Sequence, residues 1–280
     1  MPTKTPRVSV LTPIYNTNPV HLRECIESIL NQTYTDFEFL ILNDSPDNKE
    51  IEKIVLEYAK HDKRIKYSKN DKNMGITPSR NKLLKMAKGE YLAIFDHDDI
   101  SVPTRLEQEV TYLEANPEVG VVSGWLQCFG SNQDIIKNPE TDFDIKISLM
   151  DNCYVAHTAS MIRKSILIEN NIEYESFYSP AEDYCLWLRL MDVTRFYNLQ
   201  TVLVKYRCDV NQTTNTKHKE MDMAHDALVA EVRNKFPEYW RIYKLYKSER
   251  TMFRLRLFGI PLLKIKNNKI YLFEFIPIFE

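Results

Sequence analysis

Glycine is scarce in this sequence, and the glycine-rich loops that bind phosphates in many enzymes are absent. Only 6 of the 280 residues are glycine. The chain contains neither GxGxxG, which holds the pyrophosphate of a dinucleotide, nor GxxxxGK[ST], the loop of P-loop enzymes. These absences argue against a dinucleotide-dependent dehydrogenase and against a P-loop enzyme.

The cysteines form no metal-binding or disulfide pattern. There are five, an odd number, and no two are spaced as CxxC. They are widely scattered along the chain, at Cys25, Cys128, Cys153, Cys185 and Cys208. A disulfide framework and a structural zinc site are therefore not expected, and the composition is typical of a protein of the reducing cytoplasm.

Long apolar runs and a charge excess of one sign are also missing. No stretch approaches the ~18 to 20 apolar residues that span a bilayer, and residues 1–7 lack the apolar centre of a signal peptide. We therefore expect a cytoplasmic protein, or one attached only to the inner surface of the cytoplasmic membrane. The net charge of -2 argues against a nucleic-acid partner, while an apolar fraction of 44% permits a large core.

Strand and helix patterns alternate through the first hundred residues. Apolar runs at 8–11, 37–42, 65–67 and 91–95 indicate strands. Amphipathic patterns at 21–30, 49–60 and 77–87 indicate helices, the last with Thr77 as its cap and Pro78 at its first position. This alternation predicts an α/β fold with a mostly parallel, doubly wound sheet flanked by helices.

Polar residues follow three of these strands, at 12–16, 43–48 and 96–99. Ligands of doubly wound sheets bind beyond the carboxyl ends of the strands, so we expect the three clusters to share one crevice. The last cluster holds three acids, Asp96, Asp98 and Asp99, which repel one another. Magnesium or manganese would compensate them, because closely spaced oxygen ligands suit both ions. A solvated acidic turn is the alternative interpretation.

The second half of the chain is less regular. We expect a helix at 103–115, a strand at 119–123, no clear element at 125–151, a strand at 153–162 that carries His157, and a helix at 164–170. An apolar helix at 184–191 is preceded by Glu182 and Asp183. Acids in a first helical turn are favoured by the helix dipole, so by themselves these two are interpreted as caps.

The last part of the chain is basic and rich in aromatic residues. A helix is expected at 217–236, and from Arg241 onward nine basic residues stand against three acids. Residues 264–271 alternate around Asn267 and Asn268, which favours a hairpin. Two interpretations remain open: an extension that packs on its own domain, or one that binds an anionic membrane surface or a partner.

Five segments in one order carry a family resemblance. They read VSVLTPIYN at 8–16, NDS at 43–45, NMG at 73–75 with RN at 80–81, DHDD at 96–99, and EDYCLWLR at 182–189. In this order they resemble glycosyltransferase family 2, enzymes of the GT-A fold, over about residues 7–213. The resemblance implies a catalytic domain at 1–215, with a nucleotide-sugar half at about 1–100 and an acceptor half at about 101–215. Residues 216–280 would be an extension.

The resemblance also implies roles for individual residues. Thr12, Tyr15 and Asp44 would hold the nucleotide base and ribose. Arg80 would lie near the nucleotide or its phosphates. Asp96 and Asp98 would contact the ribose and a divalent metal, Mn²⁺ or Mg²⁺, that bridges the diphosphate, with Asp99 in support.

On the other side of the sugar, Asp183 would be the general base. His157, Glu182 and Trp187 would lie on the acceptor side, although a lone histidine on a strand is more often structural. A metal stabilises the charge that develops on the leaving diphosphate, and a carboxylate can accept the proton of the attacking hydroxyl. One base suffices for inversion, whereas retention would need a second carboxylate, for which Glu182 is the best candidate.

Two departures from the family pattern are visible. Tyr206 and Arg207 are followed by Cys208 and Asp209, where relatives often carry a histidine, so Asp209 is a candidate replacement. The QxxRW signature of processive synthases is absent, which favours addition of single sugars.

The expected activity is transfer from a nucleotide sugar, with UDP the expected nucleotide, to a glycan or glycolipid acceptor of a cell-surface polysaccharide such as lipopolysaccharide or capsule. A sugar nucleotidyltransferase, which would release pyrophosphate, and an inactive nucleotide-sugar-binding protein are the alternatives. The sequence contains no signal that indicates the oligomeric state.

Overall fold

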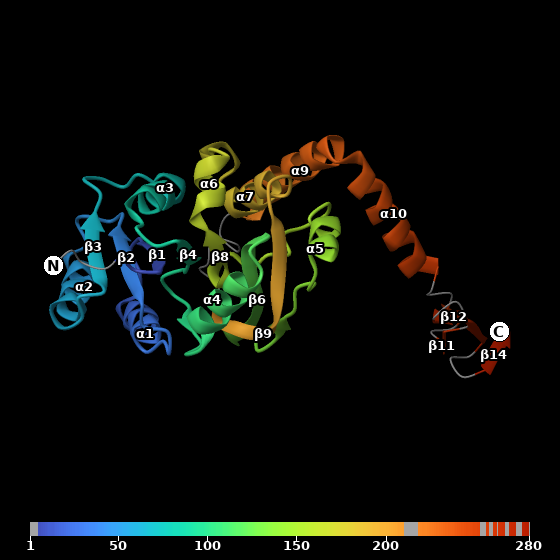
Figure 1. Cartoon of the computed structure of the whole chain (residues 1–280), viewed down its shortest axis with the longest axis horizontal. Coiled ribbons are helices and arrows are strands. Elements are labelled where there is room, and N and C mark those ends of the chain that lie inside the picture. The colour runs from blue at the N-terminus through green and yellow to red at the C-terminus, as the bar shows by residue number, and fades with distance from the viewer. Residues whose placement is uncertain are drawn as a thin grey trace. The chain divides into compact units, whose positions relative to one another are not determined.

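The computed structural model describes residues 5–209, residues 218–252 and five short ranges, 256–257, 260–261, 263–266, 269–272 and 276–279. The chain divides into two compact units, Met1–Ala230 and Glu231–Glu280. The first unit contains the sheet and the helices that cover it (Figure 1). All residues predicted to form the site belong to this unit.

Strands and helices alternate in the first part of the chain, as predicted. The elements are β1 (Val8–Ile14), α1 (Pro19–Leu30), β2 (Phe37–Asn43), α2 (Lys49–His61), β3 (Ile65–Lys69), α3 (Ile76–Met86) and β4 (Tyr91–Ile94). The four strands lie in the order β3-β2-β1-β4, and every neighbouring pair is parallel. Every residue of β1 and β2 is buried, as expected of central strands in a sheet covered on both faces.

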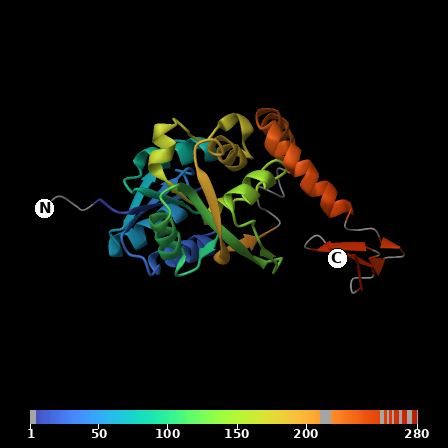
Figure 2. The ribbon, with the colours of Figure 1, turned by 45° about the vertical axis from the view of Figure 1, so that its right-hand side comes forward.

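The second part of the first unit extends the same sheet with mixed strand directions. Its elements are β5 (Ile100–Ser101), α4 (Arg105–Ala115), β6 (Val119–Gly130), β7 (Ile135–Ile136), α5 (Asp142–Ser148), the 3₁₀-helix η1 (His157–Ala159), β8 (Met161–Arg163), α6 (Lys164–Glu169), the 3₁₀-helix η2 (Ser176–Tyr178), α7 (Glu182–Leu190) and β9 (Arg195–Cys208). Strand β8 is antiparallel to β4 and β6, whereas β6 and β9 run parallel along most of their length (Figure 2).

One predicted element of this part was wrong, and others were not predicted. The strand expected at 153–162 is mostly a loop with η1, because Ser160 Oγ donates to the carbonyl of His157 at 2.7 Å and closes a local turn. Residues 125–151 are more regular than expected, since β6 continues to Gly130 and α5 follows. The long strand β9 was not predicted.

The start of α3 also differs from the prediction. The residue that caps the helix is Gly75, with a φ of +87°, and Thr77 lies inside the first turn. A positive φ is readily adopted only by glycine, which explains why one of the few glycines stands here. Pro78 remains in the first turn, where the missing N–H has no consequence.

Amphipathic patterning places the helices against the sheet. Helix α1 buries Leu22, Cys25, Ile26 and Ile29, at the spacing of one helical face. The side chains of Asn18 and Asn48 accept hydrogen bonds at the starts of α1 and α2. Such caps satisfy amides that a helix leaves without partners. The core therefore lies between these helices and the central strands.

The end of the chain contains two helices and short strands. They are α9 (His218–Lys235), α10 (Pro237–Met252), β10 (Arg256–Leu257), β11 (Ile260–Pro261), β12 (Leu263–Lys266), β13 (Lys269–Leu272) and β14 (Ile276–Phe279). The predicted hairpin is confirmed, because β12 and β13 pair antiparallel. Among the described residues, no helix combines the length and apolar character needed to cross a bilayer. Side chains beyond residue 247 lie outside the description, so the membrane role of this segment stays a prediction.

Candidate active site

The polar clusters that follow β1, β2 and β4 meet in one cleft of about 590 Å³, as predicted. Eight of the predicted site residues line it: Tyr15, Asp44, Arg80, Asp96, Asp98, His157, Glu182 and Asp183. Two others do not line it. Thr12 and Trp187 are both 0% exposed and lie in the core behind the cleft. Parallel strands explain the convergence, because their carboxyl ends lie at the same edge of the sheet.

Asp44 holds the loop that enters α3. Its carboxylate accepts hydrogen bonds from the backbone N–H groups of Met74 and Gly75, each at 2.8 Å, and from the amide of Asn70 at 2.7 Å. The carboxylate is 3% exposed but borders the cleft. Tyr15, by contrast, is 49% exposed, so its ring is open to contact with a ligand. This part of the cleft is therefore built from a fixed acid and an accessible aromatic ring.

The strand end that carries Asp96 is fixed at every backbone polar group. The N–H groups of residues 94, 95 and 96 donate to Ser160 O, Leu11 O and Thr158 Oγ1, and their carbonyls accept from Arg105 Nη2, Thr12 Oγ1 and Cys25 Sγ. Thr12 was predicted to contact the nucleotide, but its hydroxyl instead donates to the carbonyl of Phe95 and so holds this strand end in place. Two of the hydrogen-bond partners of this strand end, Ser160 and Thr158, come from the segment that carries His157.

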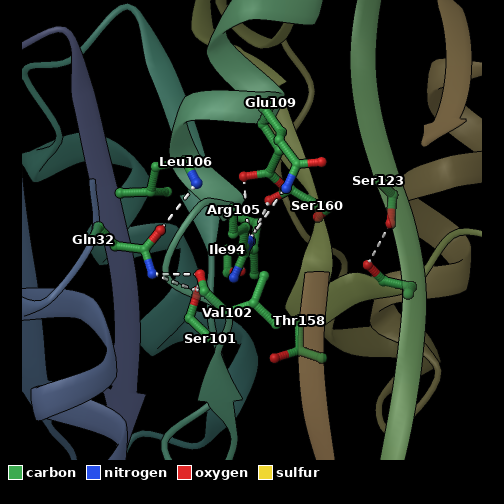
Figure 3. A network of polar contacts seen from close by, with 12 residues as sticks. Gln32, Ile94, Ser101, Val102, Arg105, Leu106, Glu109, Ser123, Thr158 and Ser160 are labelled. Carbon is green, nitrogen blue, oxygen red and sulfur yellow. Dashed lines mark hydrogen bonds and ion pairs between the residues drawn. The ribbon is translucent and has the colours of Figure 1, made fainter. Parts of the chain in front are cut away.

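A fully buried ion pair lies behind this strand end (Figure 3). Arg105 and Glu109 of α4 are both 0% exposed, and Arg105 Nε lies 3.2 Å from each carboxylate oxygen. Arg105 Nη2 donates to the carbonyls of Ile94 at 2.8 Å and Ser160 at 3.2 Å. Burial raises the pKa of Glu109 to about 7, although Arg105 opposes the rise. Arg105 therefore joins β4 to the 157–160 segment by charge-assisted hydrogen bonds.

The acidic loop is fastened to β9 by Arg207. The Arg207 N–H donates to Asp99 at 2.9 Å, its Nε donates to the carbonyl of Asp98 at 2.7 Å, and its Nη2 pairs with Glu24 at 2.5 Å. Burial, followed by the charges of Asp98 and Asp96, raises the pKa of Asp99 well above its usual range. Asp99 is therefore a structural acid of the loop. Of the three acids in this loop, only Asp96 and Asp98 line the cleft.

Asp96 and Asp98 are the candidate ligands of the divalent metal that the family resemblance implies. Within the described part of the chain, no three acid, histidine or cysteine side chains form a ready metal cluster. Magnesium is usually bound by one or two carboxylates together with phosphate oxygens of the substrate. Two carboxylates on a cleft therefore fit a metal that arrives with a diphosphate, rather than one held by protein ligands alone.

Arg80 joins the two halves of the cleft. From α3, its Nη1 reaches Glu182 at 2.6 Å and its Nη2 reaches Asp96 at 3.3 Å. The guanidinium also lies 5.6 Å from the ring centroid of Tyr174. Burial favours the neutral form of Asp96, but the charge and hydrogen bond of Arg80 together with the neighbouring His157 and His97 outweigh it and lower the pKa of this carboxyl. Asp96 is therefore ionised at neutral pH, as a metal ligand must be.

Asp183 has the opposite electrostatic environment. It follows Glu182 in the first turn of α7 and accepts a hydrogen bond from the N–H of Tyr184 at 2.7 Å. Burial and the neighbouring charge of Glu182 raise the pKa of Asp183 to about 6. A carboxylate with this pKa is ionised at neutral pH and accepts protons more readily than an ordinary aspartate.

His157 lines the cleft but is itself held in place. Only 7% of the residue is exposed, and its Nε2 lies 2.9 Å from the hydroxyl of Tyr174. Burial and the charge of Arg80 lower the pKa of His157 to about 3, so the imidazole is neutral. Its ring also lies 5.9 Å from that of Trp187, which supports it from the core.

Some residues of the site had no assigned role in the sequence. Tyr206 of β9 and Met221 of α9 line the cleft. The Tyr206-Arg207 pair was visible as a family feature, so Arg207 had a signal. Arg105 and Glu109 had none, because an i,i+4 pair on a helix usually lies on the surface. Tyr174, which contacts both His157 and Arg80, likewise had no signal in the sequence.

Two relatives illustrate the similarity in sequence. An uncharacterized glycosyltransferase of Methanocaldococcus jannaschii is 36% identical over 207 residues, covering 72% of this chain and 71% of that protein. The Escherichia coli protein WfgD, described as UDP-Glc:alpha-D-GlcNAc-diphosphoundecaprenol beta-1,3-glucosyltransferase, is 29% identical over 241 residues, covering 85% of this chain and 90% of that protein.

Solved structures share the fold. Residues 1–349 of S. aureus TarS, in complex with UDP, superpose with a TM-score of 0.60 at 16% identity, over 95% of this chain and 96% of that one. The mannosyltransferase PcManGT from Pyrobaculum calidifontis, in complex with GDP-Man and Mn²⁺, gives a TM-score of 0.57 at 19% identity, over 73% and 58%. The GT-A fold expected from the sequence is confirmed. Residues 9–170 match the profile of glycosyl transferase family 2, and the chain belongs to that family.

Proposed function

We propose that this glycosyltransferase moves a sugar from a nucleoside diphosphate donor, a UDP-sugar, to a hydroxyl of a glycan or glycolipid acceptor, with inversion at the anomeric carbon. The acceptor would belong to a cell-surface polysaccharide and be modified at the cytoplasmic side of the membrane. One observation carries the proposal. Two acids suited to bind a metal, Asp96 and Asp98, line the same cleft as Asp183, an acid suited to act as a base. Arg80 pairs with both Asp96 and Glu182, the neighbour of Asp183.

The donor would occupy the half of the cleft formed by β1, β2, α3 and the end of β4. Tyr15 offers an accessible ring to the base, Asp44 and Asp96 offer oxygens to the nucleoside, and Arg80 offers positive charge to the phosphates. Asp96 and Asp98 would hold Mn²⁺ or Mg²⁺. When bound, the metal stabilises the charge of the leaving diphosphate. The nucleotides named for TarS and PcManGT and the donor named for WfgD support a nucleotide-sugar donor.

Asp183 would act on the acceptor. As the acceptor oxygen bonds to the anomeric carbon, the bond from that carbon to the diphosphate oxygen breaks, and the hydroxyl proton passes to Asp183. Its pKa of about 6 suits this transfer near neutral pH. Glu182 is engaged by Arg80 at 2.6 Å, which disfavours it as the nucleophile of a two-step, retaining reaction. The lipid-linked sugar acceptor named for WfgD supports a glycolipid acceptor here.

Incubation with a panel of nucleotide sugars and Mn²⁺ tests this function. Slow release of nucleoside diphosphate is expected with one or more UDP-sugars. The Asp183→Asn variant should lose transfer by ~10²- to 10⁴-fold, the usual effect of removing a general base. Asp134→Asn, an equivalent change of an exposed acid outside the cleft, should retain activity.

The alternatives give different products in the same assay. Release of pyrophosphate would identify a sugar nucleotidyltransferase instead. Nucleotide binding without any turnover, with every sugar and acceptor offered, would identify an inactive binding protein. Full transfer by Asp183→Asn would remove this residue from the role of base.

A further inference from the structure

Positive charge is concentrated in one part of the sequence. Residues 49–88 contain 12 lysine and arginine residues against 5 aspartate and glutamate residues, a net charge of +7. The whole chain carries -2, so the remaining residues carry -9. The segment consists of α2, β3, α3 and their connections. A nearly neutral total therefore hides a strongly basic part of the catalytic unit.

Ten lysines of this segment are exposed. Seven of them form no ion pair with an acid in the part of the chain that the structure describes, and one of these, Lys82, instead donates to the amide oxygen of Asn70 at 2.8 Å. Four of the other six lie on α2, on β3 and on the connection between them, and we call these four the lysine surface: Lys53, Lys60, Lys63 and Lys66.

The acids of the segment do not neutralise this surface. Glu52 lies 3.2 Å from Lys49 and 2.8 Å from Lys69, two lysines outside the defined set. Glu57 pairs with Arg23 of α1, and Asp62 pairs with Arg64. Three of the five acids of the segment thus pair with cations outside the lysine surface, and the charges of the lysine surface are exposed to solvent.

The four lysines lie at the edge of the sheet that β3 forms, and Lys66 Nζ donates to the carbonyl of Lys63 at 2.7 Å. Strand β3 is the edge strand, and α2 and α3 lie beside it (Figure 1). On α2, Lys53, Leu56 and Lys60 share one exposed face at spacings of three and four residues, and Leu56 is 42% exposed. Lysine on an edge strand discourages aggregation, which accounts for Lys66. It does not account for Lys53, Lys60 and Lys63.

We propose that the lysine surface binds the anionic headgroups of a membrane. Clusters of four to eight basic residues are typical of attraction to anionic lipids. The surface contains only lysine, a hydrated point charge suited to diffuse headgroup charge, whereas specific phosphate recognition favours arginine. An exposed leucine among the lysines suits the boundary between headgroups and acyl chains.

Membrane binding would have a clear purpose for this enzyme, because it would hold the protein on the surface that carries a lipid-linked acceptor. This purpose rests on the proposed glycolipid acceptor, but the binding itself is independent of donor and catalysis, and is measured without either.

The test is co-sedimentation of the full-length chain with phosphatidylcholine vesicles, with and without phosphatidylglycerol. Wild-type protein should bind only the anionic vesicles and be released by salt. The variant Lys53→Gln/Lys60→Gln/Lys63→Gln/Lys66→Gln should bind at least ~100-fold more weakly, given the usual contribution of each basic residue near anionic lipid. Because all four side chains are exposed, the variant should melt with the wild type.

The matched control removes four charges from the other basic segment, as Lys244→Gln/Lys247→Gln/Lys264→Gln/Lys266→Gln. Its binding should stay within about tenfold of wild type. Loss of binding by this control alone would overturn the proposal and assign the membrane contact to the C-terminal segment. Equal binding by the lysine-surface variant, or binding to dextran sulfate beads but not to anionic vesicles, would overturn it as well.

Discussion

Arg80 and Glu182 lie 102 positions apart in the chain, yet their side chains form a buried ion pair at 2.6 Å. The first belongs to α3, which borders the donor half of the cleft, and the second opens α7, which carries the candidate base. Arg80 also reaches Asp96. A single guanidinium thus links an acid predicted to hold metal with the helix turn that holds Asp183, so changes on one side should be felt on the other.

The first prediction concerns Glu182→Gln. The negative charge of Glu182, after burial, raises the pKa of Asp183, so its removal should lower that pKa below about 6. The acidic limb of the pH–rate profile should therefore move to lower pH. Breaking a buried pair should also cost on the order of 3 kcal/mol in unfolding free energy. The exposed pair Arg189–Glu175 supplies the control, because Glu175→Gln should cost less than about 1 kcal/mol. An unmoved profile would contradict this account of Asp183.

The cleft was predictable from the sequence to the extent that it depends on strand direction. Tyr15, Asp44 and Asp96 each follow a strand, and parallel pairing brings strand ends to one edge whatever the details of packing. Asp183 needed the family resemblance, because an acid in the first turn of a helix is also a common cap. Its raised pKa depends on burial, which residue spacing does not report.

The contacts behind the cleft were not predictable in the same way. Thr12 belongs to a family motif, but its hydroxyl is used by the carbonyl of Phe95 at 2.9 Å. Trp187 lies on an apolar helix face, and periodicity alone does not say which aromatic ring reaches a cavity. The strand expected around His157 failed because serine and threonine side chains there bond to nearby backbone groups and replace a regular ladder. The contacts of Thr12 with Phe95 and of Thr158 with Asp96 also join residues far apart in the sequence, which periodicity along the chain does not report.

Asp183→Asn should stabilise the protein while it removes activity. The pKa of Asp183 is about 6 in the folded state and 3.8 in the reference state, so the folded protein binds this proton more tightly. The unfolding free energy of the wild type therefore falls as pH rises from 3.8 to about 6. The Asp183→Asn variant does not lose stability in this way, so above pH 6 its unfolding free energy should exceed that of the wild type by about 1 to 3 kcal/mol. Urea unfolding on both sides of pH 6 measures the difference; a gap that does not grow with pH would refute the raised pKa.

Asp98→Ala should separate metal-dependent from metal-independent binding of the donor nucleotide. The side chain faces the cleft, whereas the backbone carbonyl of Asp98 is the group that Arg207 holds, so the loop should keep its shape. Calorimetry with UDP should show that Mn²⁺ strengthens binding to the wild type and has little effect on the variant, while affinity without metal is unchanged. Asp134→Asn should behave as the wild type. The same response to Mn²⁺ in all three proteins would exclude Asp98 as a ligand.

The buried pair behind the cleft allows stability and function to be separated. Arg105→Met leaves Glu109 buried without its cation and should destabilise the protein by about 3 to 5 kcal/mol. The double variant Arg105→Met/Glu109→Leu replaces both charges with apolar groups of similar size and should regain most of that loss. It still lacks the donor that joins the carbonyls of Ile94 and Ser160. Hydrogen exchange of residues 94–99 and 157–163 should therefore be faster in the double variant, and Mn²⁺-dependent UDP binding weaker, at nearly normal stability. If exchange and binding instead recover together with stability, Arg105 serves the core alone and does not position Asp96.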